Sequence, residues 1–339
     1  MTKSWKSIFA RHETVLFIVL VLEVILFNII GRKFLTGDNV ANIVRQSVEI
    51  GLLALVMTPI ILTGGIDLSV GSLMGLCAVA FGVLWKDAGL SPWLAALGAV
   101  GVGALGGGVN ALLITRLGLP PLIVTLGTFS LFRGLAEAFT GGTKAYTGFP
   151  DSFLALGNGF ALGVPVQAWV LAAVALSMWL LVHRTTFGRA FRALGFAPEG
   201  ARYAGIPVER RQALAYTLAG AVAGLASVVF ISRVTEARAS AGVGYELAAI
   251  TAVVLGGTSI FGGIGTIHGT LLGVAAVAVL GNGLSRILSI SSISRELSGM
   301  LTGALLLLAL AAGALTKTLS ERRARRQSLP TTKPQPSTP

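Results

Sequence analysis

Long apolar stretches alternate with short polar or charged connections from residue 14 to residue 315. The hydrocarbon core of a bilayer is about 30 Å thick, so a helix needs roughly 20 apolar residues to cross it. The pattern predicts an all-α, polytopic membrane protein with about ten transmembrane helices, at residues 14–30, 43–62, 67–84, 92–115, 122–139, 167–183, 213–231, 245–261, 266–284 and 298–315. The eighth is expected to be short or broken, because glycines interrupt it at Gly256, Gly257, Gly262 and Gly263.

Basic residues concentrate on every second connection. Of the 26 Lys and Arg, sixteen lie on the side that holds both termini: three N-terminal, Arg116, six in the 184–212 loop and six in the tail. Eight lie on the other side, and Arg45 and Arg133 lie inside spans. Positive residues favour the cytoplasm, so both termini are predicted to be cytoplasmic. This divides the chain into a cytoplasmic N-terminus (1–13), a transmembrane domain (14–315) and a basic, disordered tail (316–339).

The composition agrees with a membrane protein: 54% of residues are hydrophobic and 12% are charged. A soluble domain of 339 residues needs a more charged exterior. The net charge of +12 raises the question of nucleic acid as a partner. The basic residues flank apolar segments, as they do beside anionic lipid, and no basic stripe with interleaved aromatic residues is present. Membrane lipid is therefore the expected partner of these charges, and no nucleic acid is expected.

The sequence contains motifs that superficially match cofactor-binding or phosphate-binding sites, but the residues around them do not support such a site. Gly101, Gly103 and Gly106 match GxGxxG, but inside an apolar span with no preceding strand. The glycine-rich run 256–269 lacks the Lys-Ser/Thr of a phosphate-binding loop. The three histidines are far apart in sequence, and Cys77 is the sole cysteine, so no disulfide within the chain and no metal site are expected. No enzymatic activity is expected of this chain.

Glycine supplies 44 residues, many of them spaced at four. Helices in lipid associate through close backbone approach, and small residues one turn apart form the contact stripes. Such stripes are predicted at Gly71 and Gly75, Gly103 and Gly107, Gly220 and Gly224, Gly265, Gly269 and Gly273, and Gly299 and Gly303.

Polar side chains at membrane depth are costly and so are candidates for function. The candidates for a hydrated path are Gln46, Glu49, Asn110, Thr125, Thr128 and Arg133. Arg133 has a second interpretation, an i,i+4 ion pair with Glu137. Asp67, in TGGIDLSVGS from Thr63, either caps the third span together with Ser69 or contacts a partner.

The connection from 184 to 212 contains a candidate short helix. After Pro198, residues 199–204 are expected to form a helix that ends at Gly205, and Pro207 prevents its continuation. The alternative is a solvated basic loop without a fixed partner.

Five ordered motifs resemble one known family. They are TGGIDLSVGS at Thr63, GGGVNALLI at Gly106, PPLIVTLGTFSLFRG at Pro120, the loop 199–206, and GYELAAITAVVLGGTSIFGGIGTIHGTLLG at Gly244. Together they resemble the permease subunits of ribose-type ATP-binding-cassette (ABC) importers, which carry ribose, xylose, rhamnose, galactosides or autoinducer-2. The branched-chain amino-acid permeases are more distantly similar. The segment at Phe139 resembles the rhamnose and autoinducer-2 permeases more than the ribose ones, and the whole resemblance runs from about Ile8 to Leu315.

The resemblance implies an ABC importer permease fold in the bacterial inner membrane. The implied partners are two ATPase subunits, a second permease, identical or homologous, and a periplasmic substrate-binding protein. ATP and Mg²⁺ would bind the ATPase subunits, and no cofactor this chain. The coupling helix that meets the ATPase would comprise Glu199, Gly200, Ala201, Ala204, Gly205 and Ile206.

Charge complementarity with the binding protein suggests docking residues on the outer face, Arg32, Lys33, Lys144, Arg233 and Arg238. Three positions, Ala111, Gly200 and Ala248, depart from the family pattern. The competing function is an ion-coupled secondary sugar transporter, which needs a carboxylate near the midplane. Glu23 and Glu49 are the candidates for that carboxylate.

Overall fold

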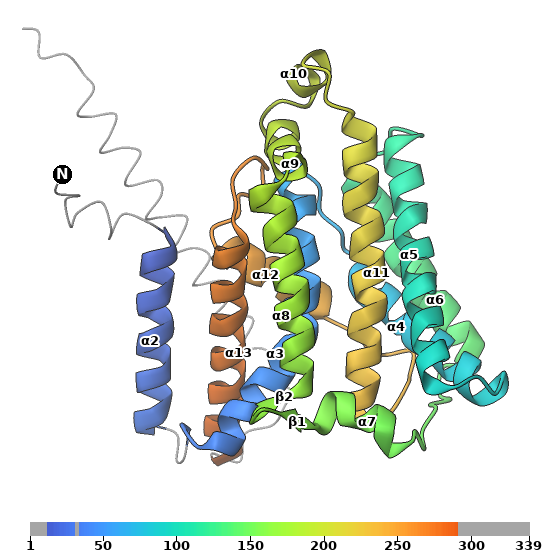
Figure 1. Ribbon diagram of the computed structural model, residues 1–339, viewed down its shortest axis with the longest axis vertical. Coiled ribbons are helices and arrows are strands. Elements are labelled where there is room, and N and C mark those ends of the chain that lie inside the picture. Colours follow the sequence, from blue (N-terminus) through green and yellow to red (C-terminus); the bar gives the residue numbers. More distant parts are fainter. Residues whose placement is uncertain (1–11, 31–33, 291–339) are drawn as a thin grey trace, which may run out of the picture.

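The computed structural model describes residues 12–30 and 34–290, which form a bundle of long helices (Figure 1). The membrane-length helices are α2 (His12–Ile30), α3 (Gly37–Leu62), α4 (Val70–Gly82) with its π-helical continuation (Val83–Asp87), α5 (Pro92–Thr115), α6 (Pro121–Thr140), α8 (Val166–Trp179) with its π-helical continuation (Leu180–Arg184), α11 (Val208–Val234) and α13 (Ile267–Ile290). The shorter elements are α7 (Asp151–Asn158), α9 (Thr186–Phe196), α10 (Pro198–Tyr203), α12 (Tyr245–Leu255) and a hairpin of β1 (Phe160–Ala161) and β2 (Val164–Pro165), paired Phe160 with Pro165.

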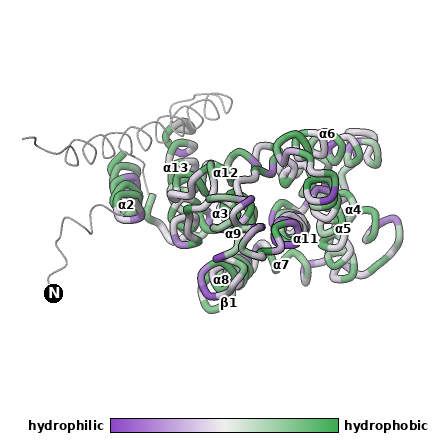
Figure 2. Tube along the Cα trace, turned by 90° about the horizontal axis from the view of Figure 1, so that it is seen from above, coloured by the Kyte–Doolittle hydropathy of each residue, from purple (hydrophilic) through white to green (hydrophobic). Residues whose placement is uncertain are grey.

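Within the described ranges, eight helical segments are long and apolar enough to cross a membrane. They confirm the first seven predicted spans and the ninth, each within two helical turns at either end. The tenth predicted span (298–315) and the tail (316–339) lie outside the described residues, as does nearly all of the N-terminal segment. Apolar residues cover the outward faces of α2, α6 and α8 in the view along the bundle (Figure 2). This apolar exterior fits a lipid environment.

The eighth predicted span is a helix of only 11 residues, α12. At 1.5 Å per residue it is about 16 Å long, roughly half the thickness of the hydrocarbon core. The chain then turns through residues 256–266, where Gly257, Gly262 and Gly263 adopt positive φ angles. This loop meets the 63–69 loop between α3 and α4, because the Gly263 N–H donates to the Leu62 carbonyl at 3.0 Å. The expectation of a short span is confirmed.

Glycines let α5 and α11 pack backbone against backbone. A Cβ on Gly103 would lie 2.2 Å from the carbonyl oxygen of Gly220, and one on Gly220 would lie 2.1 Å from that of Gly103. A Cβ on Gly107 would lie 2.3 Å from the carbonyl oxygen of Tyr216. The predicted glycine stripe is confirmed here, and no larger residue fits without moving one helix.

The glycine pair on α4 has a different role from the predicted helix contact. A Cβ on Gly71 would lie 1.9 Å from Glu246 Oε2, and one on Gly75 would lie 2.7 Å from Arg133 Nη1. Here the missing side chains make room for two charged side chains and for the backbone carbonyls of Ala239 and Gly242, rather than for the backbone of a facing helix. Residue spacing alone does not distinguish these two uses of glycine.

The two long connections lie at opposite ends of the bundle (Figure 1). Helices α9 and α10, from the 184–212 loop, lie at one end, and α7 with the β-hairpin lies at the other. This agrees with the alternation of sides that the charge pattern predicts. We call these ends the α10 end and the α7 end.

Candidate functional site

Buried polar side chains from α5, α6 and the 63–69 loop form one hydrogen-bonded group, which we call the Asn110 cluster (Asp67, Ser69, Asn110, Thr125 and Thr128). Asn110 Nδ2 donates to Ser69 Oγ at 2.8 Å, and Asn110 Oδ1 accepts from Thr128 Oγ1 at 2.7 Å. The Ser69 N–H and hydroxyl both donate to Asp67 Oδ1, at 2.8 and 2.7 Å. The Thr125 hydroxyl donates to the Ile66 carbonyl at 3.2 Å. Three of the predicted path residues therefore lie together against the TGGIDLS motif.

The predicted capping of α4 is only approximated. Ser69 occupies the N-cap position but makes no side-chain hydrogen bond to the first turn. Asp67 accepts from the N–H of Ser69, just before the helix begins, which makes an Asx-type turn. The carboxylate thus satisfies one backbone donor at the entry of α4 and orients Ser69 toward Asn110.

Tyr216 of α11, which the sequence analysis did not single out, also reaches this loop. Its hydroxyl is buried, and a Cβ on Gly65 would lie 2.4 Å from it. No hydrogen bond joins this hydroxyl to any part of the chain that the structure describes. The signal in the sequence was a single phenol in an otherwise apolar stretch.

Arg133 of α6 is held by backbone carbonyls. Its Nη1 donates to the carbonyl of Ala239, and it also reaches the carbonyl of Ala241 at 3.4 Å. Arg133 and Glu137 are both described, and no ion pair joins them. The i,i+4 interpretation is therefore wrong: the guanidinium extends across α4 to the loop that precedes α12.

Glu246, in the first turn of α12, is a second residue that sequence reasoning missed. Its Oε1 accepts from the Gly244 N–H at 3.2 Å, while its Oε2 is buried without a hydrogen-bond partner among the described residues. It lies against Gly71, one turn along α4 from Gly75 and Arg133. An acidic residue directly before an apolar stretch was the available signal. In the sequence it was indistinguishable from a helix-start residue.

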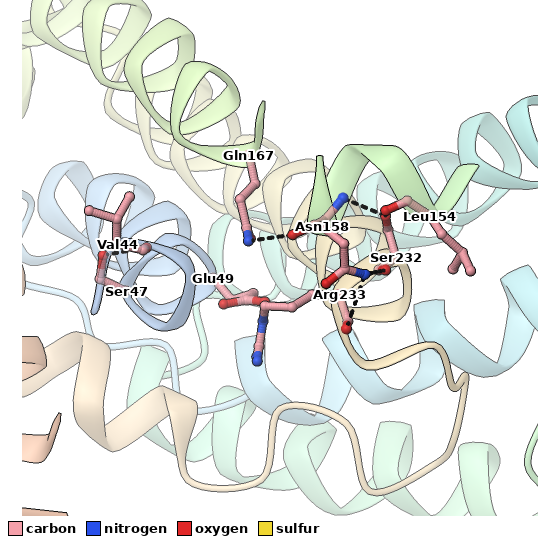
Figure 3. A network of polar contacts seen from close by, with 9 residues as sticks. Val44, Ser47, Glu49, Leu154, Asn158, Gln167, Ser232 and Arg233 are labelled. Carbon is pink, nitrogen blue, oxygen red and sulfur yellow. Dashed lines mark hydrogen bonds and ion pairs between the residues drawn. The ribbon is translucent and has the colours of Figure 1, made fainter. Parts of the chain in front are cut away.

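Glu49 of α3 and Arg233 of α11 form an ion pair toward the α7 end. Arg233 Nε lies 2.7 Å from Glu49 Oε1, and the Glu49 side chain has no exposed surface. Figure 3 shows this pair beside a polar network at the start of α8. There the Asn158 side-chain amide donates to the Ser232 carbonyl at 2.9 Å, and Gln167 donates to the Gly157 carbonyl at 2.8 Å. Glu49, a candidate for the hydrated path, is thus the ion-pair partner of Arg233, a candidate for docking of the binding protein.

The remaining candidates are more dispersed. Gln46 is exposed on α3, and Arg32 and Lys33 lie outside the described residues. Arg238 pairs with Glu236 at 3.3 Å, and Lys144 with Asp87 at 3.3 Å. A side-chain hydrogen bond with Tyr146, and then the pairing with Asp87, raise the pKa of Lys144. Lys144 and Arg238 are about half exposed, so both remain accessible to a partner.

The predicted short helix in the 184–212 loop is confirmed as α10 (Pro198–Tyr203). Gly205 follows with φ +78°, and the N–H of Ile206 donates to the Ala201 carbonyl at 3.0 Å. Ala201 packs into a small core with Leu194 and Val208. Glu199, Gly200, Ala204 and Gly205 are exposed, and Tyr203, at 92%, is the most exposed large side chain of α10.

Helix α9 links α10 to the end of α3 and to the 256–266 loop. The sequence analysis missed this helix, although Ala190, Phe191 and Leu194 recur at helical spacing and are buried. A Cβ on Gly195 would lie 2.1 Å from the Leu62 carbonyl oxygen and 2.2 Å from the Gly263 nitrogen. Helix α9 therefore rests directly on both, at the place where α3 ends.

The described residues contain no group of three or more His, Cys, Asp or Glu able to hold a metal. Cys77 is buried and free. His183 and His268, distant in sequence, have ring centroids 5.2 Å apart. Two imidazoles alone do not complete a tetrahedral metal site.

Comparison with known proteins gives a consistent result. Residues 39–310 match the family model described as "Branched-chain amino acid transport system / permease component". The chain is 38% identical to the autoinducer 2 import system permease protein of Enterobacter sp. strain 638, over 87% of this chain and 90% of that protein. It is 41% identical to the ribose import permease protein of Bacillus subtilis strain 168, over 81% and 85%. No solved structure matches the chain significantly.

Proposed function

We propose a cargo and partners for this chain on the basis of its family. The match over residues 39–310 shows that the chain belongs to the family of permease components of branched-chain amino acid transport systems. The chain is a multi-pass permease of the cell's inner membrane. We propose that it forms the translocation path of an ATP-binding-cassette importer for a monosaccharide or sugar-like polyol. Rhamnose, autoinducer-2 and ribose represent this class, and permeases for the last two are among the relatives.

The single observation that carries the mechanism is the contact of α9 with Leu62, at the end of α3, and with Gly263 of the 256–266 loop. An importer of this kind must transmit force from a separate ATPase to the path. Helix α10 projects at one end of the bundle, and α9 continues from it to Leu62 and Gly263. Elements that are closely packed, with no void between them, transmit a displacement to each other as rigid bodies. We assign α10 as the coupling helix, with Glu199, Gly200, Ala204, Gly205 and Tyr203 on its exposed surface.

The proposed assembly contains two ATPase subunits, a second permease and a periplasmic binding protein. ATP and Mg²⁺ would bind the ATPase subunits, and the residues that catalyse ATP hydrolysis would belong to those subunits rather than to this chain. The α10 end is then cytoplasmic, in accord with its six basic residues. The α7 end faces the binding protein, with Lys144 and Arg238 as accessible cations.

The polar side chains suit an uncharged cargo rich in hydroxyl groups. The Asn110 cluster contains amide and hydroxyl groups that are buried and bonded to one another here, so they would meet a cargo when the path opens, and its carboxylate is bonded to Ser69. Glu49, a carboxylate that the ion-coupled alternative would use, is paired with Arg233. Glu23, the other candidate, has a buried Oε2 without a hydrogen-bond partner among the described residues. The choice of ATP over ion coupling therefore rests on the family and the relatives.

Uptake by reconstituted vesicles tests the proposal. The permease, its ATPase and its binding protein are reconstituted together, and radiolabelled ribose, rhamnose and autoinducer-2 are supplied with internal ATP. We expect uptake of at least one cargo that stops when ATP is omitted and continues when a protonophore and a sodium ionophore are added. Uptake that persists without ATP and collapses with the ionophores would refute the importer.

A further inference from the structure

Near the α10 end, α8 and α13 both pack on α3. A hollow of about 210 Å³ lies between α8 and α13, lined by Ala175, Leu176, Trp179, Ile267, His268 and Leu271, and we call it the groove; Figure 2 shows the positions of the two helices. Four of these six side chains are aliphatic. Leu176 is 59% exposed, so the apolar wall is open to the surroundings of the protein. Inside a membrane, such a wall contacts hydrocarbon chains.

The rim of this groove is cationic and aromatic. The Arg184 guanidinium lies 5.0 Å from the centroid of the Trp179 ring, and the His268 ring packs edge-on against Trp179 at 6.1 Å. Arg184 and His268 are exposed. Glu13, the acidic residue beside His183, accepts from the Thr266 hydroxyl at 2.7 Å, a neutral donor, so it still acts electrostatically on this site. Two guanidinium groups, Arg184 against Trp179 and Arg192 near His183, outnumber this one carboxylate, so the rim keeps a net positive charge.

Trp179 also carries an unused hydrogen-bond donor. Its indole Nε1 is buried, and no described residue accepts from it. A buried N–H without an acceptor is destabilising, and tryptophan is enriched where one end of a side chain is apolar and the other meets polar groups. Of the two histidines beside it, His183 already accepts from the Ile267 N–H through Nε2. The indole N–H thus lacks an acceptor among the described residues, and a ligand oxygen would supply one where the side chains that cover Nε1 move aside.

We propose that this groove binds one anionic glycerophospholipid, with an acyl chain along Ala175, Leu176 and Leu271 and the phosphate at Trp179, Arg184 and His268. Charge complementarity identifies the occupant, since a cationic rim above an apolar wall matches an acidic headgroup above its hydrocarbon chain. Basic pockets between helices at the cytoplasmic side suit anionic lipids generally. The assignment of this lipid to the cytoplasmic leaflet rests on the orientation given under the proposed function. The binding of an anionic lipid to the groove does not depend on that orientation.

Native mass spectrometry of the full-length protein, in the assembly that is extracted from membranes, tests this proposal. The probes are dioleoyl phosphatidylglycerol and dioleoyl phosphatidylcholine, which share acyl chains and differ in headgroup charge. We expect the wild type to retain phosphatidylglycerol preferentially. Arg184→Gln should lower that affinity about fivefold, the equivalent of about 1 kcal/mol for one basic residue at an anionic surface. Trp179→Phe, which keeps the ring and removes the donor, should lower it by a similar factor.

Arg189→Gln is the matched control, because Arg189 is exposed on α9, whereas Arg184 stacks on Trp179 of the groove. Equal losses in Arg184→Gln and Arg189→Gln would reduce the effect to general surface charge and overturn the site. So would a wild type that retains both lipids equally. Displacement of the lipid by soluble glycerophosphate at the same concentration would identify a site for free phosphate instead. None of these outcomes depends on transport or ATP, so they remain distinct from a failure of the proposed function.

Discussion

Arg233 and Glu49 join α11 to α3 through an ion pair whose carboxylate is completely buried, with Nε and Oε1 2.7 Å apart. Loss of one partner leaves the other as a buried, uncompensated charge, which typically costs about 3–5 kcal/mol. In Arg233→Ala the remaining charge is Glu49; because the Arg233 side chain is 20% exposed, the space that it leaves opens to water, which reduces the cost. We expect Arg233→Ala to destabilise the protein by about 3 kcal/mol, measured by thermal unfolding in detergent.

The matched control for this change is Arg238→Ala. Arg238 pairs with Glu236 near the protein surface, and its side chain is 46% exposed. Exposed pairs contribute roughly 0–1 kcal/mol. If the two alanine variants unfolded at the same temperature, the buried pair would have no special structural role.

The backbone contact of α5 with α11 makes a second prediction. Gly220→Ala places a Cβ 2.1 Å from the Gly103 carbonyl oxygen, so one helix must move. Overpacking of this kind costs about 1–3 kcal/mol. Gly101→Ala, with nothing within 4 Å of its new Cβ, should be neutral or stabilising. Thermal unfolding of both variants measures the difference, and equal unfolding temperatures would contradict the packing.

The role of Asn110 can be separated from stability. In Asn110→Leu, Ser69 still donates to Asp67, and Thr128 still donates to the Val124 carbonyl at 3.0 Å. The fold should therefore lose only about 1 kcal/mol. Uptake should fall more than tenfold if the amide meets the cargo, and the same transport assay measures this.

Thr115→Val is the control for Asn110→Leu, because the Thr115 hydroxyl bonds only within α5, to the Ala111 carbonyl. It should transport normally. Normal uptake in Asn110→Leu would remove Asn110 from the path.

The exposed side chain of Tyr203 is expected to contribute to the coupling between α10 and the ATPase. A large aromatic side chain that is 92% exposed contributes little to the fold of its own chain, but buried aromatic residues often dominate an interface. We expect Tyr203→Ala to insert at normal abundance and to reduce cargo-stimulated ATP hydrolysis about tenfold or more. Tyr203→Phe keeps the ring and should retain most of the activity. A fully coupled alanine variant would argue against α10 as the contact.

Orientation is testable with single cysteines, because Cys77, the native cysteine, is buried and should give little background. In spheroplasts, a membrane-impermeant maleimide should label Lys144→Cys directly. It should label Ala204→Cys only after permeabilisation. The opposite pattern would reverse the assignment of both ends.

Periodicity and charge predicted the helices well because lipid leaves few alternatives for the backbone. The same constraint explains why α10 could be placed: Pro198, Gly205 and Pro207 restrict the local backbone wherever the segment lies. Helix α9 was missed because its apolar face is short and lies within a basic loop.

Partners in space were less predictable than positions in sequence. Asn110, Thr125 and Thr128 were identified as polar residues at membrane depth, but their shared contact with Ser69 and Ile66 depends on how three segments fold together. Glu49 and Arg233 were assigned different roles because 184 residues separate them along the chain. Glu246 and Tyr216 gave no local pattern that sets them apart from ordinary helix residues.

The position of Gly195 limits how α9 can move. Its backbone touches the Leu62 carbonyl and the Gly263 nitrogen, and no flexible side chain lies between them to absorb a displacement. An inward movement of α9 by even one ångström must therefore displace the ends of both loops by a similar distance. Both loops therefore move together with α9, and neither can open or close independently of the other.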